Sequence, residues 1–222
     1  MTTPQESAPA HLRATAITPS YAAGATDAFA FLLLGGIFTA NMTGNLVLAG
    51  LTQRPGYSAM LVGIVIALAA FSLGLYTSFA IARPRPPVSR LVTVQLLGTL
   101  AQIAVLLGWI WSPVGMGVAR EVMLIALSAF AMAAQTVVSK RLEGHSGVST
   151  TYVTGTITSL IADFADSKSQ DSFTRIGVIA ALVVGALSGS LLINVAPALG
   201  AALPILPAAG GVTLLVMGSG KA

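Results

Sequence analysis

Long stretches without a charged residue dominate this sequence and limit what it can fold into. Uncharged runs occupy residues 55–82, 91–119, 122–139 and 176–220. Each run reaches or approaches the ~20 residues that a helix needs to cross the hydrocarbon core of a bilayer, and the last is long enough for two crossings. Only 8% of the residues are charged, against about 25% in a typical soluble domain. We therefore predict an all-α polytopic membrane protein, and the composition excludes a soluble enzyme, a nucleic-acid-binding protein and a disordered chain.

Eight apolar segments can be drawn, and two of them are short and rich in Thr, Asn and Gly. The segments are residues 16–36, 38–53, 57–82, 90–111, 117–139, 149–165, 173–195 and 198–219. At 1.5 Å per residue, the ~16 residues of a short segment reach only ~24 Å, which is less than the ~30 Å hydrocarbon thickness. A short segment could therefore cross fully, or enter the membrane and return to the same side. Residues 1–15 are too polar for a signal peptide, and we expect a disordered cytoplasmic tail there.

The positions of Lys and Arg separate these two possibilities, because cytoplasmic loops carry an excess of positive charge. If all eight segments cross, the 11 Lys and Arg residues divide six against five between the two sides. If the two short segments return, all of them except Arg54 and Arg120 lie on the cytoplasmic side, nine against two. We therefore predict six crossings plus two re-entrant or broken segments, with both termini in the cytoplasm.

The two short segments are also similar to each other in sequence. FTANMTGNLVLAGL and STTYVTGTITSLIA align with Thr43 on Thr154, an offset of 111 residues that also pairs Gly74 with Gly185. We therefore divide a single membrane domain into repeat 1, residues 16–111, and repeat 2, residues 112–222. With three crossings in each repeat, the second repeat must be inverted relative to the first. Inverted repeats with discontinuous helices recur in membrane transporters.

Asp27 is a candidate functional residue, because it lies near the middle of the first apolar segment. Arg13 is the only basic residue within twenty positions of it. An ionised carboxylate at that depth costs about 2.5–3.5 kcal/mol or more, so Asp27 should face the interior of the protein. It could bind a proton, a cation or a substrate. It could instead hydrogen-bond the Thr and Asn residues of the neighbouring segment and hold the fold together.

Polar residues around the two Thr-Gly pairs are further candidates for a substrate or ion site. They are Asn41, Thr43, Gly44 and Asn45 in the first segment, and Tyr152, Thr154, Gly155 and Thr156 in the second. A short helix that ends inside the membrane leaves backbone groups without partners, and an N-terminal end attracts anions. Two such ends meeting near the midplane would form a polar site. Helix packing is the alternative interpretation, because Gly and Thr are common wherever membrane helices touch.

Gln135 completes the set of candidates, and the sequence contains no recognisable catalytic motif. Gln135 could face the same cavity as segment 149–165, or it could hydrogen-bond a neighbouring helix. The motifs HExxH, GxSxG and Walker A are absent, the chain has no Cys, and both His residues, His11 and His145, lie in polar segments. We therefore expect no enzymatic activity, no cofactor and no metal.

Two stretches resemble a known family. GATDAFAFLLLGGIFTANMTGNLVLAG resembles the N-terminal signature of the YoaK family of bacterial inner-membrane proteins, and AMAAQTVVSKRL with TTYVTGTITSL is similar to the second conserved region of that family. The resemblance implies a multi-pass protein of the bacterial inner (cytoplasmic) membrane. It implies no substrate, because the family is grouped under a domain of unknown function.

Two functions of different classes are consistent with these features. The first is a small-solute or ion transporter or channel, with a polar midplane site lined by Asp27 and the two Thr-Gly segments. The alternative is a non-transporting membrane scaffold, or a subunit that binds a partner or a lipid. The expected partners are the lipid bilayer, a small solute or ion and a second copy of the chain, and no nucleic acid.

Overall fold

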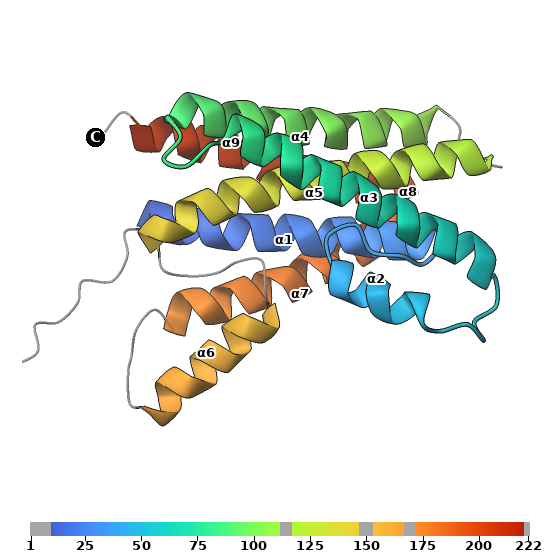
Figure 1. Ribbon diagram of the computed structural model, residues 1–222, viewed down its shortest axis with the longest axis horizontal. Helices are drawn as coiled ribbons and strands as arrows, with labels where there is room; N and C mark the ends of the chain where they lie inside the picture. Colours follow the sequence, from blue (N-terminus) through green and yellow to red (C-terminus); the bar gives the residue numbers. More distant parts are fainter. Residues whose placement is uncertain (1–9, 112–116, 147–152, 167–171, 220–222) are drawn as a thin grey trace, which may run out of the picture.

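The structure is a computed structural model that describes residues 10–111, 117–146, 153–166 and 172–219, and every regular element in these ranges is an α-helix (Figure 1). The all-α prediction is therefore confirmed. The helices are α1 (Ala10–Leu33), α2 (Met42–Ala49), α3 (Tyr57–Ile81), α4 (Val88–Ile110), α5 (Val118–Ser146), α6 (Val153–Ala165), α7 (Ser172–Val195), α8 (Pro197–Ala202) and α9 (Ile205–Ser219).

Several helices are long and apolar enough to span a membrane, so the chain is a multi-pass membrane protein. Within the described ranges, five spans meet both criteria: α3, α4, Val118–Leu142 of α5, α7, and Pro197–Met217, which joins α8 to α9. The remaining predicted crossing is α1, which has 24 residues but contains Pro19 and Asp27. It packs against α5, α7 and α9 in the middle of the bundle (Figure 1). A helix surrounded by protein tolerates polar residues that a lipid-facing helix does not.

The contact between α1 and α7 is the most extensive of all the helix pairs. Glycine brings the two backbones together. A Cβ atom at Gly185 of α7 would clash with the carbonyl oxygen of Tyr21, and one at Gly24 of α1 would clash with that of Leu182. Small residues at such crossings allow the close backbone approach on which membrane helices depend for packing.

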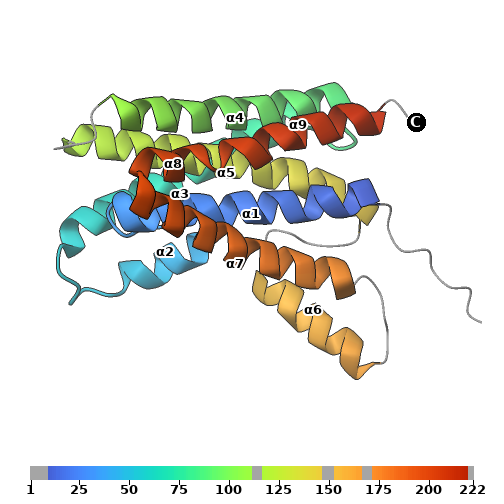
Figure 2. The same cartoon turned by 180° about the vertical axis from the view of Figure 1, so that it is seen from behind.

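The course of the chain distinguishes the two short helices from the long ones. We call the two ends of the bundle the Ala10 end and the Leu33 end, after the first and last residues of α1. Figure 1 shows that α2 begins beside the middle of the bundle and runs back to the Leu33 end, where α3 begins. It shows α6 beginning near the middle and running toward the Ala10 end, where α7 begins. Figure 2 shows the same arrangement from behind, with the C-terminal end of α9 at the Ala10 end.

The structure differs from the predicted boundaries at the start of the first helix and within the last segment. The first helix begins at Ala10, so residues 10–15 of the expected tail are helical, while residues 1–9 lie outside the described ranges. The predicted segment 198–219 is divided into α8 and α9. The break falls at Pro204, which has no backbone N–H to continue the helical hydrogen-bond pattern.

The main apolar core lies between α1, α3, α4 and α5. It includes Phe29 of α1 and Trp109 of α4, whose rings meet edge to face with centroids 5.2 Å apart. The geometry is one that aromatic pairs prefer. This core fixes α1 against α4 at the level of Asp27, two residues before Phe29.

Candidate functional site

The carboxylate of Asp27 is the centre of the candidate site. Its Oδ1 atom accepts hydrogen bonds from the backbone N–H groups of Thr39, at 2.8 Å, and Ala40, at 2.7 Å. Its Oδ2 atom accepts one from the N–H of Asn41, at 3.0 Å. Hydrogen bonds to an ionised acceptor are about twice as strong as neutral ones. Asp27 therefore fixes the segment that leads into α2.

Glycine makes it possible for this segment to reach Asp27. Gly35 and Gly36 have φ angles of 76° and 72°, in the region that only glycine enters without strain. The turn directs the chain back along α1 to Asp27, six residues before α1 ends at Leu33. At 1.5 Å per residue, α2 begins about 9 Å inside the Leu33 end, and its eight residues are only ~12 Å long.

Two asparagines hold the first turn of α2. Asn41 is the N-cap residue, and its Oδ1 accepts a hydrogen bond from the N–H of Gly44 at 3.0 Å. Asn45 is fully buried: its Oδ1 accepts from the N–H of Phe38 at 2.8 Å, and its Nδ2 donates to the carbonyl oxygen of Phe38 at 2.7 Å. Both asparagines therefore have structural contacts, whereas Thr43 is exposed beside them.

Replacing Asn45 with leucine is expected to lower the free energy of unfolding by about 2–4 kcal/mol, because two backbone groups of Phe38 lose their partners. Thr43→Val is the matched control on the same helix. Its side chain is exposed, so the change should stay within about 0.5 kcal/mol. Thermal unfolding of the two variants in detergent measures the difference. Equal unfolding temperatures would contradict the role of Asn45.

The carboxylate of Asp27 lies beside the chain that leads into the N-terminus of α2. We expected that such an end would attract an anion. The structure instead places a carboxylate next to it, which accepts from the N-cap residue Asn41 and from the two residues before it. The charged side chains beside the preceding turn are Arg54 and Glu121. A Cβ atom at Gly36 would lie 2.6 Å from a guanidinium nitrogen of Arg54, and one at Gly35 would lie 2.8 Å from a carboxylate oxygen of Glu121. Among the described residues, no positive charge forms an ion pair with Asp27.

The candidates of the second Thr-Gly segment lie on α6, which packs against α7. Thr154 and Gly155 are exposed and Thr156 is buried, while Tyr152 lies outside the described residues. In Figures 1 and 2, the N-terminal ends of α2 and α6 are the ends nearer the middle of the bundle. The described hydrogen bonds of Asp27, Asn41 and Asn45 all lie within residues 27–45, so none of them reaches α6.

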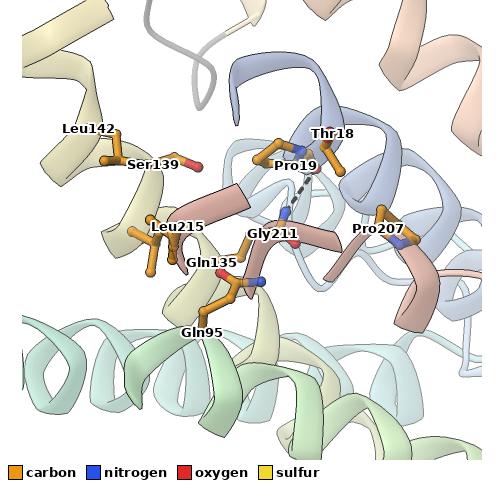
Figure 3. Close-up of a pocket in the computed structure, with 10 residues that line it drawn as sticks. Thr18, Pro19, Gln95, Gln135, Ser139, Leu142, Pro207, Gly211 and Leu215 are labelled. Carbon is orange, nitrogen blue, oxygen red and sulfur yellow. Dashed lines mark hydrogen bonds between the residues drawn. The ribbon is translucent and has the colours of Figure 1, made fainter. Parts of the chain in front are cut away.

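Gln135 lies apart from Asp27, at the contact of α5 with α1. Its Nε2 donates to the carbonyl oxygen of Pro19 at 2.8 Å, as Figure 3 shows. The sequence allowed Gln135 either to face a cavity with segment 149–165 or to hydrogen-bond a neighbouring helix, and this contact is such an interhelical hydrogen bond. Gln135 also lines a cavity of about 20 Å³ between α1, α4, α5 and α9, together with Gln95, Thr18 and Ser139. A volume of that size holds about one water molecule.

The structure adds three polar residues that we did not single out. Thr39 and Ser128 are fully buried, and their hydroxyl oxygens lie 3.1 Å apart. Thr26 accepts a hydrogen bond from Gln102 of α4 at 3.1 Å. One sequence signal could have located Ser128, because it lies seven residues before Gln135 and therefore on the same face of the helix. In the described part of the chain, no group of three or more His, Asp or Glu side chains could hold a metal ion.

Comparisons with known proteins place this architecture in a family. Residues 15–217 match the family described as "Protein of unknown function (DUF1275)". The chain is similar to the UPF0700 transmembrane protein YoaK of Bacillus subtilis (strain 168), with 30% identity over 172 residues that cover 73% of each chain. No solved structure matches. The resemblance found in the sequence is therefore confirmed.

Proposed function

We propose that this chain, which belongs to the DUF1275 family of proteins of unknown function, is a small-solute or ion transporter or channel of the bacterial inner membrane. The observation that carries the proposal is the position of Asp27. Its carboxylate lies within the membrane domain and holds the segment that leads into α2, a short helix that begins beside the middle of the bundle. Ionisable residues inside membrane segments usually mark ion or substrate pathways, and discontinuous helices form such sites in transporters.

The helix contacts support an inverted repeat. α1 packs against α7 as α3 packs against α5, and α2 packs against α3 as α6 packs against α7. Gly185 meets α1 at Tyr21, and Gly74 meets α5 at Phe130 and Ala133. With the repeat offset of 111 residues, Tyr21 corresponds to position 132, which lies between these two α5 residues. The first helix of each half thus contacts the second long helix of the other half, as a two-fold relation between the repeats requires.

The chemistry of the site favours a cation, a proton or a neutral polar solute over an anion. Asp27 brings a negative charge to the chain that leads into α2, and a negative charge repels an anion. The side chains of Asn41, Thr43 and Thr154 are exposed on α2 and α6. Polar side chains at this depth are unfavourable against lipid. We therefore infer that they face water, with Thr43, Thr154, Gly155 and Thr156 lining the path.

Flux measurements in reconstituted vesicles test the proposal. We expect Asp27→Asn to abolish the flux of the transported solute or ion, with protons included among the candidates. Thr43→Val should reduce the flux without unfolding the protein, because its side chain is exposed. Thr93→Val is the matched control, since Thr93 is also exposed but bonds only to Ser89 of its own helix. The proposal is wrong if wild type and both site variants give the same flux for every candidate.

Thiol labelling in intact cells tests the proposed topology, because the chain has no native Cys. Among the described residues, every Lys and Arg except Arg54 and Arg120 lies at the Ala10 end, which we therefore assign to the cytoplasm. An impermeant thiol reagent should label Thr52→Cys at the Leu33 end and leave Ser89→Cys unlabelled. Labelling of Ser89→Cys alone would contradict this orientation.

A non-transporting membrane scaffold is the second candidate function. It is favoured by the contacts of Asp27, because a carboxylate that only held the fold together would bond the same three amides. Co-purification of a second protein in stoichiometric amount, together with the absence of any flux, would support it.

A further inference from the structure

Buried polar side chains lie on α1, α4, α5 and the segment before α2, between the cavity in Figure 3 and Asp27. Three of them share one face of α4, since they are spaced by four and three residues, and they are at most 7% exposed. The other three come from α1, α5 and the segment before α2, and they are at most 1% exposed. We call this set the polar seam, and its members are Gln95, Thr99, Gln102, Thr26, Ser128 and Thr39.

Gln102 has a buried oxygen atom that forms no hydrogen bond within the part of the chain that the structure describes. The hydroxyl of Thr26 donates to the carbonyl oxygen of Ala22 at 2.8 Å, so it must accept its second hydrogen bond from Gln102 Nε2, at 3.1 Å. Because Nε2 faces Thr26, the other polar atom of the amide is Gln102 Oε1. It is buried and has no hydrogen-bond partner among the described residues. Nearly all buried polar atoms in proteins are hydrogen-bonded. An acceptor in this position can take a hydrogen bond from a small donor, of which water is the smallest.

The contacts between α4 and α5 place Gln102 at the level of Ser128. Gly98 lies against Ala131 and Ala134, and Gly108 lies against Leu124. Gln102 lies between these two crossings on an antiparallel pair, so it is opposite the part of α5 that contains Ser128. From Ser128, the hydroxyl contact to Thr39 leads to the residue whose N–H donates to Asp27.

The other end of the seam opens on the cavity of about 20 Å³ that Gln95 lines. Figure 3 shows Gln95 rising from α4 below Gln135. Seven residues separate Gln95 from Gln102, which is ~10 Å along a helix. A cavity of this size holds about one water molecule and leaves no room for a larger solute. Ionisable residues inside membrane segments commonly belong to proton relays, and Asp27 is the ionisable residue that Thr39, a member of the seam, contacts through its N–H.

We propose that the polar seam conducts protons between the Ala10 end and Asp27, on water molecules ordered by Gln102 Oε1 and by the hydroxyls of the seam. A hydronium ion transfers its proton to the Asp27 carboxylate, which becomes a neutral carboxyl, and a water molecule remains. Arg54 and Glu121 are the charged side chains beside the turn at this end of α1, and neither lies on the seam. The inference rests on the proposed transport function and names the proton as the conducted or coupled ion.

Proton flux into vesicles that contain the full chain and trapped pyranine tests the proposal. A pH gradient is imposed while valinomycin and potassium hold the membrane potential at zero. We expect Gln102→Leu to lower the protein-dependent rate at least about tenfold, toward that of protein-free vesicles, because the polar relay is interrupted. Ser128→Ala removes only one oxygen atom, so it tests the seam in a fold-preserving variant, and we expect it to lower the rate as well. Thr93→Val, on the exposed side of α4, should leave the rate unchanged.

The outcomes separate this inference from the proposed function. Loss of proton flux in Asp27→Asn, Gln102→Leu and Ser128→Ala, with Thr93→Val unaffected, supports the seam. Loss in Asp27→Asn with wild-type rates in Gln102→Leu and Ser128→Ala overturns the seam and leaves the transporter in place. A wild-type protein that moves a solute but no protons also overturns the seam. Absence of all flux, of solute and of protons, overturns both proposals.

Discussion

Replacing Asp27 with leucine is expected to release the segment between α1 and α2 and to lower the free energy of unfolding by about 3–6 kcal/mol. The N–H groups of Thr39, Ala40 and Asn41 all lose their acceptor in this variant. Inside a membrane domain, each of them would remain without a partner unless water entered. Asp27→Asn should have a smaller effect, because the amide keeps one oxygen that can accept two of the three bonds.

Thermal unfolding in detergent measures the loss of stability, and thiol labelling at Ala40→Cys measures the release of the segment between α1 and α2. Ala40 is half-buried in the wild-type structure, so its labelling rate should rise when α2 is released. Asp163→Asn is the control, because its carboxylate pairs with Arg175 at the contact of α6 with α7, away from α2, and the amide oxygen can still accept that hydrogen bond. If Asp27→Leu and Asp163→Asn gave the same unfolding temperature and labelling rate, Asp27 would not hold α2.

Replacing Gly185 with alanine is expected to disrupt the contact between α1 and α7, the most extensive of the bundle. The added methyl group would clash with the carbonyl oxygen of Tyr21, a backbone atom that cannot rotate away. The two helices would have to separate along their whole contact. We expect a loss of about 3 kcal/mol or more in the free energy of unfolding, at or beyond the upper end of the usual cost of overpacking.

The matched control for Gly185 is Gly210 of α9, where a Cβ atom would have nothing within 4 Å. Gly210→Ala should be neutral or stabilising by up to about 1 kcal/mol, because alanine favours the helix over glycine. Gly24→Ala should behave as Gly185→Ala does, since its methyl group would clash with the carbonyl oxygen of Leu182. Unfolding temperatures of the three variants in one detergent test the set. Similar values for Gly185→Ala and Gly210→Ala would contradict the role of the close approach.

The membrane location, the helical class and the family can all be recognised without coordinates. Membrane-spanning length and apolar composition are local properties of a stretch of chain, so the uncharged runs were enough to identify them. Asp27 and the asparagines near the first Thr-Gly pair were also recognisable, because polar residues are conspicuous in an apolar segment. The end of the first helix was placed three residues late, at residue 36, where Gly35 and Gly36 adopt positive φ angles.

The partners of these residues depended on the tertiary structure. Sequence reasoning allowed Asp27 to hydrogen-bond the Thr and Asn residues of the next segment, and it does bond Thr39 and Asn41. What the sequence did not show is that it bonds their backbone N–H groups, and that of Ala40, which the glycine turn directs toward it. Gln135 was recognised as an interhelical residue at most, because nothing local indicates that it meets Pro19, 116 positions away. In the same way, nothing local indicates that Gln102 meets Thr26, 76 positions away.

One physical cause separates the features that the sequence predicts from those that only the tertiary structure determines. Solvation by lipid acts on each segment separately and can be read from the residues of that segment. Hydrogen bonds and glycine contacts between α1, α4, α5 and α7 depend on how the helices lie against one another, and helices far apart in the chain supply the two partners. The buried oxygen of Gln102, which has no partner among the described residues, also depends on contacts between helices. The Thr26 hydroxyl donates to the carbonyl oxygen of Ala22, so it accepts from the amide nitrogen of Gln102 and not from its oxygen.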